Sequence, residues 1–232
     1  MYLALERNVA EKFSVNIRKF ENRDRGQLRR ISHDTAFMGQ PATLFFEGKE
    51  IICDALSLYF TDYEPESSFI AEVNSTIVGY LIGAKNKALS ENVFKNKIML
   101  CLFWKALKSG VFFNKKNIIF IASCLGALLK GGLSDPDFRK EYPATFHINL
   151  RKEFRGQNIG AALIGAYLNY LKEKMIPGVH LATMSEAGAD FFSKQSFQLL
   201  YKGKRSYFRH ILHKDVPLYI YGKKLGDVSI FT

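Results

Sequence analysis

The stretch FRGQNIGAALI, residues 154–164, decides the fold of this chain. Its two glycines, Gly156 and Gly160, allow backbone N–H groups to come close to a ligand. The run of helix formers that follows predicts a helix whose first N–H groups are unpaired and whose start is the positive end of a dipole. Together these features predict an anion site, and the usual anion is a phosphate. The alternative is that a turn and a helix simply need glycines and a cap.

The glycine spacing excludes two common phosphate motifs. A mononucleotide P-loop reads G-x-x-x-x-G-K-[ST], and nothing in the chain matches it. A dinucleotide fingerprint reads G-x-G-x-x-G soon after an early strand, and Gly156 and Gly160 are spaced wrongly for it. A different phosphate-bearing ligand is therefore expected.

Strands and helices alternate around this stretch. A strand over residues 144–150 leads into it, and a helix from about residue 160 to residue 175 follows, ended by Pro177-Gly178. Ser185 is the expected cap of a later helix, with Glu186 in its first turn. The other expected elements are strands at 13–20, 67–73, 76–85, 179–184, 197–211 and 216–225, and helices at 21–37, 48–63 and 185–197. The residues between the second and third strands, Asn74-Ser75, indicate a two-residue hairpin turn.

Residues 85–142 break this alternation. They hold two apolar helical segments with eleven Lys or Arg and four Asp or Glu, a net charge of +7. The apolar run 118–129 is too short to cross a membrane, which takes about 20 residues. The segment predicts a buried helix or a lid. Docking on a membrane surface through its lysines and Phe or Trp side chains is the less favoured alternative.

Composition bounds the class of protein. With 232 residues, 47% hydrophobic and 24% charged, the chain is expected to form a single domain over 13–226 that includes the helical insertion 85–142. The net charge of +11 indicates either a solvated lysine-rich surface or an anionic ligand. Nucleic acid is not favoured, because no recognisable motif is present.

The cysteines and the N-terminus indicate the compartment. Cys53, Cys101 and Cys124 are odd in number, widely spaced and in apolar settings, so they predict reduced core residues and neither a disulfide framework nor a metal site. The first 13 residues carry acids and no continuous apolar core, unlike a signal peptide. A cytoplasmic protein is expected.

A family resemblance follows from the quoted stretch. The pattern [RQ]-x-x-G-x-[GA] is met as Gln157-x-x-Gly160-x-Ala162, with Arg155-Gly156 just ahead, and it resembles the acetyl-CoA motif of the GNAT N-acetyltransferase superfamily. The element order from about residue 13 to 225 is similar to that fold. The resemblance implies an α/β (α+β) GNAT fold, a mixed central sheet of about seven strands flanked by helices, with a helical insertion between the third and fourth strands. YEPESSFIAEV, FHINL, PGVHLAT and PLYIYGKKL resemble more closely the branch that includes the acetyltransferase-like domain of O-GlcNAcases and its bacterial relatives.

The resemblance also implies an activity and a co-substrate. The activity is an acetyl-CoA-dependent N-acetyltransferase in which a primary amine attacks the thioester directly, with no metal. The acceptor is unknown, and a small amine or an amino sugar is favoured over a protein. The family's final strands often mediate dimers, so a homodimer is one option. The implied cofactor-binding residues are Leu150, Arg155, Gly156, Gln157, Asn158, Ile159, Gly160, Ala161, Ser185 and Phe192.

The last expected helix departs from the family pattern. Ser185 stands for the usual asparagine, Phe192 for the tyrosine that protonates the leaving thiolate, and Ser196 for a glycine. Phe192 cannot give a proton, so Tyr201, Tyr207 or a water would replace it. The alternative is a non-catalytic module that binds or senses acyl-CoA.

The candidates for proton transfer and substrate binding lie elsewhere. His147 is the first candidate base, because its ordinary pKa of about 6.5 suits proton transfer near neutral pH. Asn149 emerges from the same strand face, and a half-buried histidine bonded to backbone is the alternative role for His147. Glu72 is a further catalytic candidate. Tyr63 and Glu64 are the candidate substrate residues, Glu64 and Glu66 are alternative bases, and His180 is expected to be structural.

Overall fold

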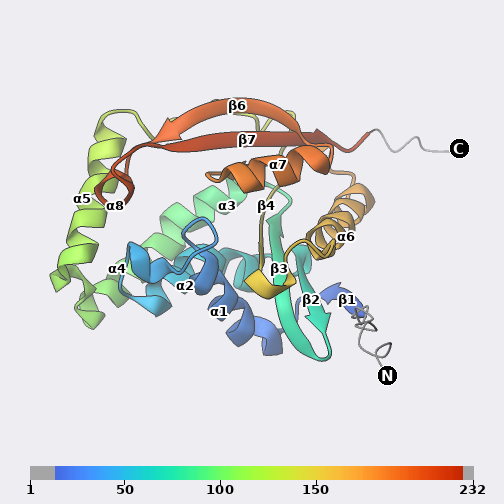
Figure 1. Ribbon diagram of the computed structural model, residues 1–232, viewed down its shortest axis with the longest axis horizontal. Helices are drawn as coiled ribbons and strands as arrows, with labels where there is room; N and C mark the ends of the chain where they lie inside the picture. The colour runs from blue at the N-terminus through green and yellow to red at the C-terminus, as the bar shows by residue number, and fades with distance from the viewer. Residues whose placement is uncertain (1–13, 227–232) are drawn as a thin grey trace, which may run out of the picture.

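The computed structural model describes residues 14–226 (Figure 1). Phe13, the first residue of the predicted first strand and of the predicted domain, lies outside the described residues, as does the N-terminal segment 1–13. The mixed α/β architecture expected from the sequence is confirmed.

Four antiparallel strands form the first sheet. They are β1 (Val15–Lys19), β2 (Ser68–Val73), β3 (Thr76–Ala84) and β4 (Thr145–Leu150), in the order β1-β2-β3-β4. The predicted turn between β2 and β3 is confirmed, because Asn74 and Ser75 have φ of 48° and 61°. Positive φ at both central residues is what a type I′ hairpin turn requires.

Helices cover both faces of this sheet. On one face lie α1 (Arg25–Thr35) and α2 (Lys49–Leu58), and Leu28 packs there with Tyr80 and Ile82 of β3. On the other face lies α6 (Ile159–Glu173), whose Tyr167 hydroxyl donates to the Ala84 and Thr145 carbonyls at 3.1 and 2.9 Å. β4 therefore presents alternate side chains to two different cores.

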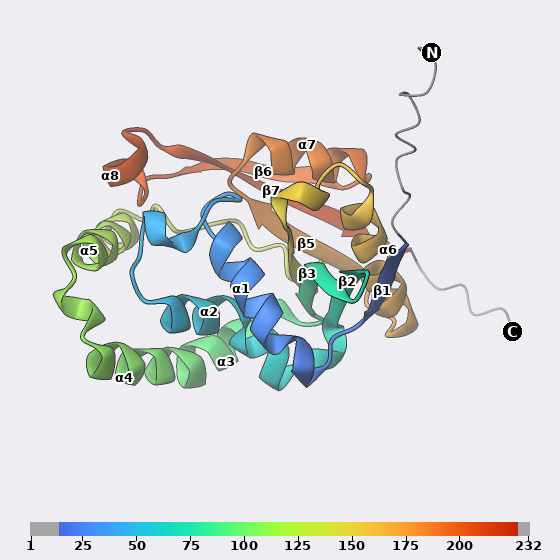
Figure 2. The same cartoon turned by 60° about the horizontal axis from the view of Figure 1, so that its bottom comes forward.

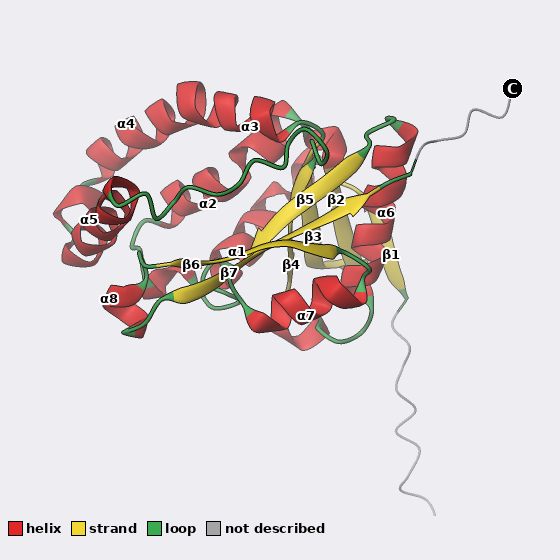
Figure 3. Ribbon diagram, turned by 90° about the horizontal axis from the view of Figure 1, so that it is seen from above, coloured by secondary structure: helices red, strands yellow, loops and turns green. Residues whose placement is uncertain are grey.

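Three further strands form the second sheet. They are β5 (Gly178–Thr183), β6 (Gln198–Arg205) and β7 (Val216–Lys224), all antiparallel, in the order β5-β7-β6. The short α8 (Arg209–Leu212) joins β6 to β7, and α7 (Glu186–Lys194) packs beside them (Figure 3). The seven strands of the described chain are therefore divided between two sheets, which touch through one parallel bridge between Ala144 and Val179.

The segment between β3 and β4 is helical, as predicted. It contains α3 (Lys87–Val93), α4 (Met99–Ser109) and α5 (Lys115–Leu129). In Figure 1, α5 stands beside α8 at one end of the molecule and α6 lies at the other. No helix in residues 14–226 is long and apolar enough to cross a membrane. The described chain also has short 3₁₀ helices, which are η1 (Asn22–Asp24), η2 (Ala42–Leu44), η4 (Pro65–Ser67), η6 (Val111–Phe113) and η7 (Lys152–Phe154). Two π-helical segments, η3 (Tyr59–Tyr63) and η5 (Phe94–Ile98), extend α2 and precede α4.

Two expectations of full burial are wrong. The run 118–129 does not form a buried helix, because α5 buries one side only and leaves Leu125 and Leu129 exposed; the alternative, a lid, stays a prediction. The helix is apolar on more than one face, and only its inner face finds a packing partner. Cys101 is exposed on α4 for the same reason, whereas Cys53 is buried as predicted.

Candidate functional site

The two sheets part just beyond the contact between β4 and β5. The Ala144 N–H donates to the Gly178 carbonyl at 3.2 Å, and the His180 N–H donates to the Ala144 carbonyl at 2.9 Å. Beyond this point, in the described chain, β4 pairs only with β3 and β5 only with β7. The facing edges of β4 and β5 thus diverge with backbone groups free of a partner strand. An extended, amide-bearing ligand can bond to such an edge as an added strand does.

The quoted glycine loop lies at the end of β4. Gly156 has φ of 78° and Asn158 has φ of 60°, both in the left-handed region. Helix α6 begins at Ile159, and no side chain caps it. Residues 155–158 are exposed, and the first turn of α6 holds no acid. The first N–H groups of the helix are therefore available to an anion.

Gly160 holds the start of α6 against two other elements. A Cβ at this position would lie 2.9 Å from the Phe191 ring of α7 and 3.6 Å from the Leu150 side chain of β4. Leu150 and Gly160, two of the predicted cofactor-binding residues, are thus brought together. Any larger residue at position 160 would force Phe191 to move.

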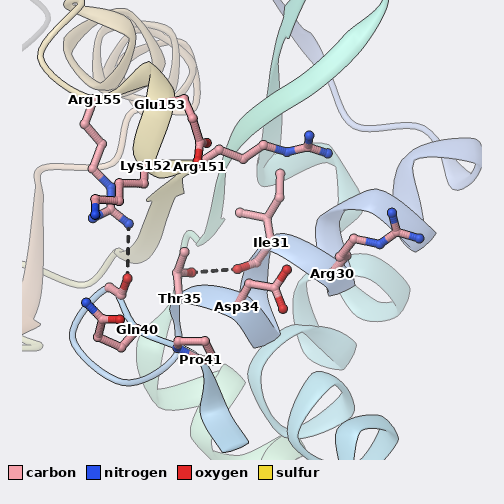
Figure 4. A pocket seen from close by; sticks show the side chains of 11 residues that line it. Arg30, Ile31, Asp34, Thr35, Gln40, Pro41, Arg151, Lys152, Glu153 and Arg155 are labelled. Atoms are coloured by element: carbon pink, nitrogen blue, oxygen red, sulfur yellow. Dashed lines mark hydrogen bonds between the residues drawn. The ribbon is translucent and has the colours of Figure 1, made fainter.

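Arg155 joins this loop to the segment after α1. Its Nε donates to the Leu150 carbonyl at 3.2 Å and its Nη2 to the Gly39 carbonyl at 3.4 Å. In Figure 4 the Arg155 side chain points toward the loop that carries Gln40, whereas Arg30 and Arg151 extend to the other side. Gln157 instead donates to the Glu153 carbonyl at 3.1 Å and supports the loop from within.

A cavity of about 330 Å³ lies between α1 and this loop. Four cationic side chains and two carboxylates line it, so it has a net positive charge and suits an anionic group. The charged lining residues are Arg30, Asp34, Arg151, Lys152, Glu153 and Arg155.

His147 lies on the face of β4 that is turned toward α1 and α2. It pairs with Ile82 of β3, and its ring meets the Phe60 ring edge-on at 5.6 Å. Burial among protein atoms, with a smaller contribution from Lys87, lowers the pKa of His147 to about 4. The side chain is nevertheless accessible to solvent. This exposed side chain is therefore a neutral imidazole at pH 7.

Asn149 shares that face and is already bonded. Its side-chain amide donates to the Tyr80 hydroxyl at 2.8 Å. Burial raises the pKa of Tyr80 to about 12, so its hydroxyl stays protonated near neutral pH. The sequence alone does not reveal this partner, because the register of β3 on β4 sets it.

Glu72 lies away from His147. Glu72 pairs with Ile77 of β3, whereas His147 pairs with Ile82 of the same strand. Ile77 and Ile82 are five residues apart, which corresponds to about 17 Å along the strand. Arg18 donates to Glu72 from Nε at 2.8 Å. The structure therefore does not bring these two predicted catalytic residues together.

The other candidate acids hold the segment before β2. Glu64 is buried and accepts from the Tyr59 hydroxyl at 2.9 Å and the Lys85 N–H at 2.8 Å. Glu66 pairs with the Lys85 ammonium at 2.8 Å. Tyr63 is half-exposed and stacks on Tyr59 with ring centroids 6.0 Å apart. Contact of Tyr63 or Glu64 with a substrate stays a prediction.

The residues predicted on α7 have clear structural contacts. Ser185 is confirmed as the helix cap, because its hydroxyl accepts from the Gly188 N–H at 3.0 Å. Phe192 is buried, with its ring centroid 6.0 Å from that of Phe146 and 5.8 Å from that of Phe197. Phe192 is therefore a core side chain, and it has no hydroxyl group that could donate a proton.

Of the two alternative proton donors, Tyr207 is bonded. Its hydroxyl lies 3.2 Å from the Met184 sulfur, and burial raises the pKa of Tyr207.

His180, expected to be structural, lies with its Nδ1 2.5 Å from the Tyr142 carbonyl and its Nε2 3.0 Å from the Lys87 ammonium nitrogen. Within residues 14–226 no group of three or more His, Cys, Asp or Glu side chains is arranged to hold a metal ion.

Comparison with solved structures identifies the fold. The chain superposes on the protein SsHAT with a TM-score of 0.68 at 20% identity, over 92% of this chain and 100% of that one. It superposes on the Drosophila melanogaster polyamine N-acetyltransferase that forms N-acetylagmatine with a TM-score of 0.57 at 14% identity, over 91% of this chain and 100% of that one. It also superposes on yncA of Salmonella typhimurium, solved with its cofactor acetyl-CoA, with a TM-score of 0.55 at 8% identity, over 93% of this chain and 96% of that one.

These similarities define the architecture. The described chain has the GNAT fold, as the glycine motif and the element order predict. No protein-family profile and no curated protein matches the sequence.

Proposed function

We propose that this chain is an acetyl-CoA-dependent N-acetyltransferase that moves an acetyl group to a primary amine. The observation that carries the proposal is the exposed glycine loop leading into the uncapped start of α6, placed where β4 and β5 diverge. A phosphate needs N–H donors at a helix start, and an extended amide arm needs a free strand edge. The chain offers both side by side.

In this proposal, different segments of the chain bind different parts of acetyl-CoA. Loop residues 155–158 and the first N–H groups of α6 receive the pyrophosphate. The edge of β4 up to Leu150 receives the amide-bearing arm. The cationic cavity beside Arg155 offers a further place for a phosphate. Acetyl-CoA supplies the activated acetyl group as a thioester.

His147 is the proposed proton acceptor. In the reaction the amine nitrogen bonds to the acetyl carbon, the carbon–sulfur bond breaks, and its electron pair leaves with the sulfur. The amine loses one proton, which a neutral imidazole can take directly or through a water. The lowered pKa of His147 keeps that imidazole neutral at pH 7, although it also makes it a weaker base than the ordinary histidine expected from the sequence. A proton then reaches the leaving sulfur from water or from a side chain other than Phe192.

We propose a small amine or an amino sugar as the acceptor. The support is that one structure on which the chain superposes is a polyamine N-acetyltransferase that forms N-acetylagmatine. Kinship with the O-GlcNAcase-related branch remains a proposal that rests on the short sequence segments. The free cysteines support the further proposal that the enzyme works in the cytoplasm.

A second candidate is a module that binds acetyl-CoA without turning it over. The buried, aromatic surroundings of Phe192 favour it, because no hydroxyl is present where the family pattern places a tyrosine.

Calorimetry and thiol release test both candidates. The chain is titrated with acetyl-CoA and, as the matched control, with acetyl-pantetheine, which lacks the pyrophosphate. Free thiol is then followed with agmatine, spermidine, glucosamine and a lysine peptide. Binding of acetyl-CoA but not of acetyl-pantetheine, with thiol release for one amine, supports the transferase. Tight binding without release for any amine supports the non-catalytic module, and no binding of acetyl-CoA overturns both.

A further inference from the structure

Helix α4 has an apolar face that no part of the described chain covers. Met99, Leu100, Phe103, Trp104 and Leu107 recur at the spacing of one helix side and are each between 50% and 57% exposed. Its opposite side is used in packing, where Ala106 is buried and Leu102 packs against a cluster with residues of α1 and β3. The exposed face is therefore a second apolar face and not the usual core stripe of an amphipathic helix.

Helix α5 repeats this arrangement. Ile118, Leu125 and Leu129 lie on one side of the helix and are 51%, 55% and 88% exposed. Phe120, on the inner side, packs against Phe45 with ring centroids 4.8 Å apart. Figure 2 shows α4 and α5 along the outer edge of the molecule, joined by a short connection. That connection carries Phe113, which is 88% exposed.

Exposure on this scale marks a binding surface. Monomeric proteins rarely leave large contiguous apolar patches in water, because transfer of apolar surface out of water is favourable. The exposed apolar side chains of α4, α5 and the connection between them are called the outer apolar surface below.

The charge of this segment identifies its partner. Residues 95–130 hold seven lysines and no Asp, Glu or Arg. Lys105 pairs with Asp54 and Lys116 with Glu47. The other five have no carboxylate within ion-pair distance in residues 14–226; they are Lys95, Lys97, Lys108, Lys115 and Lys130. A second copy of this chain carries the same +7 segment, so like charges would oppose a symmetric contact through it.

We propose that the outer apolar surface docks on an anionic lipid membrane, with α4 and α5 lying in the interface and not crossing it. Apolar side chains with Trp and Phe among them enter the acyl boundary, and the lysines remain at the level of the anionic headgroups. Neither helix qualifies as a membrane span. This inference is independent of the proposed transferase activity.

Trp104 makes the docking measurable without a label, because it is the chain's single tryptophan. The full chain is mixed with vesicles of phosphatidylcholine plus phosphatidylserine, and with vesicles of phosphatidylcholine alone. The expected result is a blue shift of Trp104 fluorescence and co-sedimentation with the anionic vesicles only, weakened by added salt. No binding to anionic vesicles at low salt overturns the proposal, as does equal binding to both vesicle types.

Surface variants separate docking from damage to the fold. Leu107→Ser with Leu125→Ser is expected to weaken vesicle binding by about tenfold or more. Leu199→Ser changes a similarly exposed leucine on β6 and is the matched control, with binding unchanged.

A second pair of variants tests the charge. Lys108→Gln with Lys115→Gln is expected to weaken binding by roughly tenfold, while Lys172→Gln with Lys194→Gln, on α6 and α7, leaves it unchanged. Equal effects of the two lysine pairs overturn the assignment to this surface. Sedimentation velocity tests the remaining outcome, a dimer of this chain. If the wild-type chain is a dimer that does not bind vesicles, and the variant with both leucines changed is a monomer, the surface binds a second copy and the proposal is overturned.

Discussion

The side-chain amide of Asn149 donates to the hydroxyl of Tyr80 at 2.8 Å, across the paired strands β4 and β3. This bond engages the Asn149 amide in holding the sheet face together. The side chain of His147, two residues earlier on the same face, makes no hydrogen bond within residues 14–226 and instead meets the Phe60 ring. The two predicted catalytic residues on β4 are therefore not equivalent, and His147 is the one that is free to meet a substrate.

His147→Gln is expected to lower kcat by about 100-fold or more, since a positioned base contributes roughly 10²–10⁴ in rate. The acetyl-CoA Kd should stay unchanged, because the phosphate loop is elsewhere. Steady-state kinetics with the amine found by thiol release, together with calorimetry, measures both. The matched variant Asn149→Ala, on the same strand face, should lose much less. Full activity in His147→Gln would remove His147 from the mechanism.

The pKa of His147 also predicts how stability depends on pH. In the unfolded chain this pKa is about 6.5, and in the folded chain it is lowered to about 4. Between these values the unfolded state binds more protons, so the free energy of unfolding contributed by His147 falls as pH falls. Urea unfolding at pH 7 and pH 5 should show a larger loss in the wild type than in His147→Gln. Equal losses would mean that the histidine titrates normally.

Local signals in the sequence are enough to predict several features of this fold. The positive φ values of Asn74 and Ser75 form the hairpin turn between β2 and β3. Ser185 caps α7 by accepting one hydrogen bond from the N–H of Gly188, three residues later in the chain. Gly156 and Gly160 mark the loop before α6. Each of these features depends on neighbours in the chain, which is why a single sequence contains the signal.

The features that the sequence does not reveal depend on distant residues. The bond between Asn149 and Tyr80 joins residues 69 positions apart, and the contact of Arg155 with Gly39 spans 116. The two-sheet division depends on where β4 and β5 part. The exposure of α5 is not evident from the sequence for a different reason: a helix that is apolar on two faces gives no periodicity to show which face is covered.

Gly156→Ala tests the phosphate loop. The left-handed φ of 78° costs an L-residue about 1 kcal/mol or more, although the space around the position is open. The loop should shift to relieve this strain, and the acetyl-CoA affinity should fall by roughly fivefold to tenfold. Calorimetry measures the affinity and urea unfolding the stability.

Gly165→Ala is the matched control for the loop variant. Gly165 lies within α6 with no atom near its would-be Cβ, so alanine should stabilise the fold by roughly 0.5–1 kcal/mol. Acetyl-CoA affinity should not change. If both glycine variants alter the affinity equally, the loop conformation is not what binds the phosphate.

Ser185→Ala separates capping from cofactor contact. Loss of the bond from the Gly188 N–H should cost about 1 kcal/mol of stability. Ser185→Asp keeps an acceptor at the cap and should restore most of that stability. An acetyl-CoA affinity that stays constant across both variants would assign Ser185 to the helix cap alone, whereas an affinity that falls in both variants would assign it to the cofactor.

Phe192→Tyr tests whether this position faces the reacting sulfur. The Phe192 ring is buried against Phe146, Phe197 and Tyr221, with centroids 5.8 to 6.3 Å away. A hydroxyl added among these rings loses its water without gaining a partner, which costs about 1–3 kcal/mol. We therefore expect a less stable protein with unchanged kcat, measured by urea unfolding and by thiol release. Phe113→Tyr is the exposed control, because Phe113 is 88% exposed and should accept a hydroxyl at little cost. A Phe192→Tyr variant with higher kcat and undiminished stability would show instead that the ring edge reaches the acetyl-transfer site, and that the wild-type chain works there without the family's proton donor.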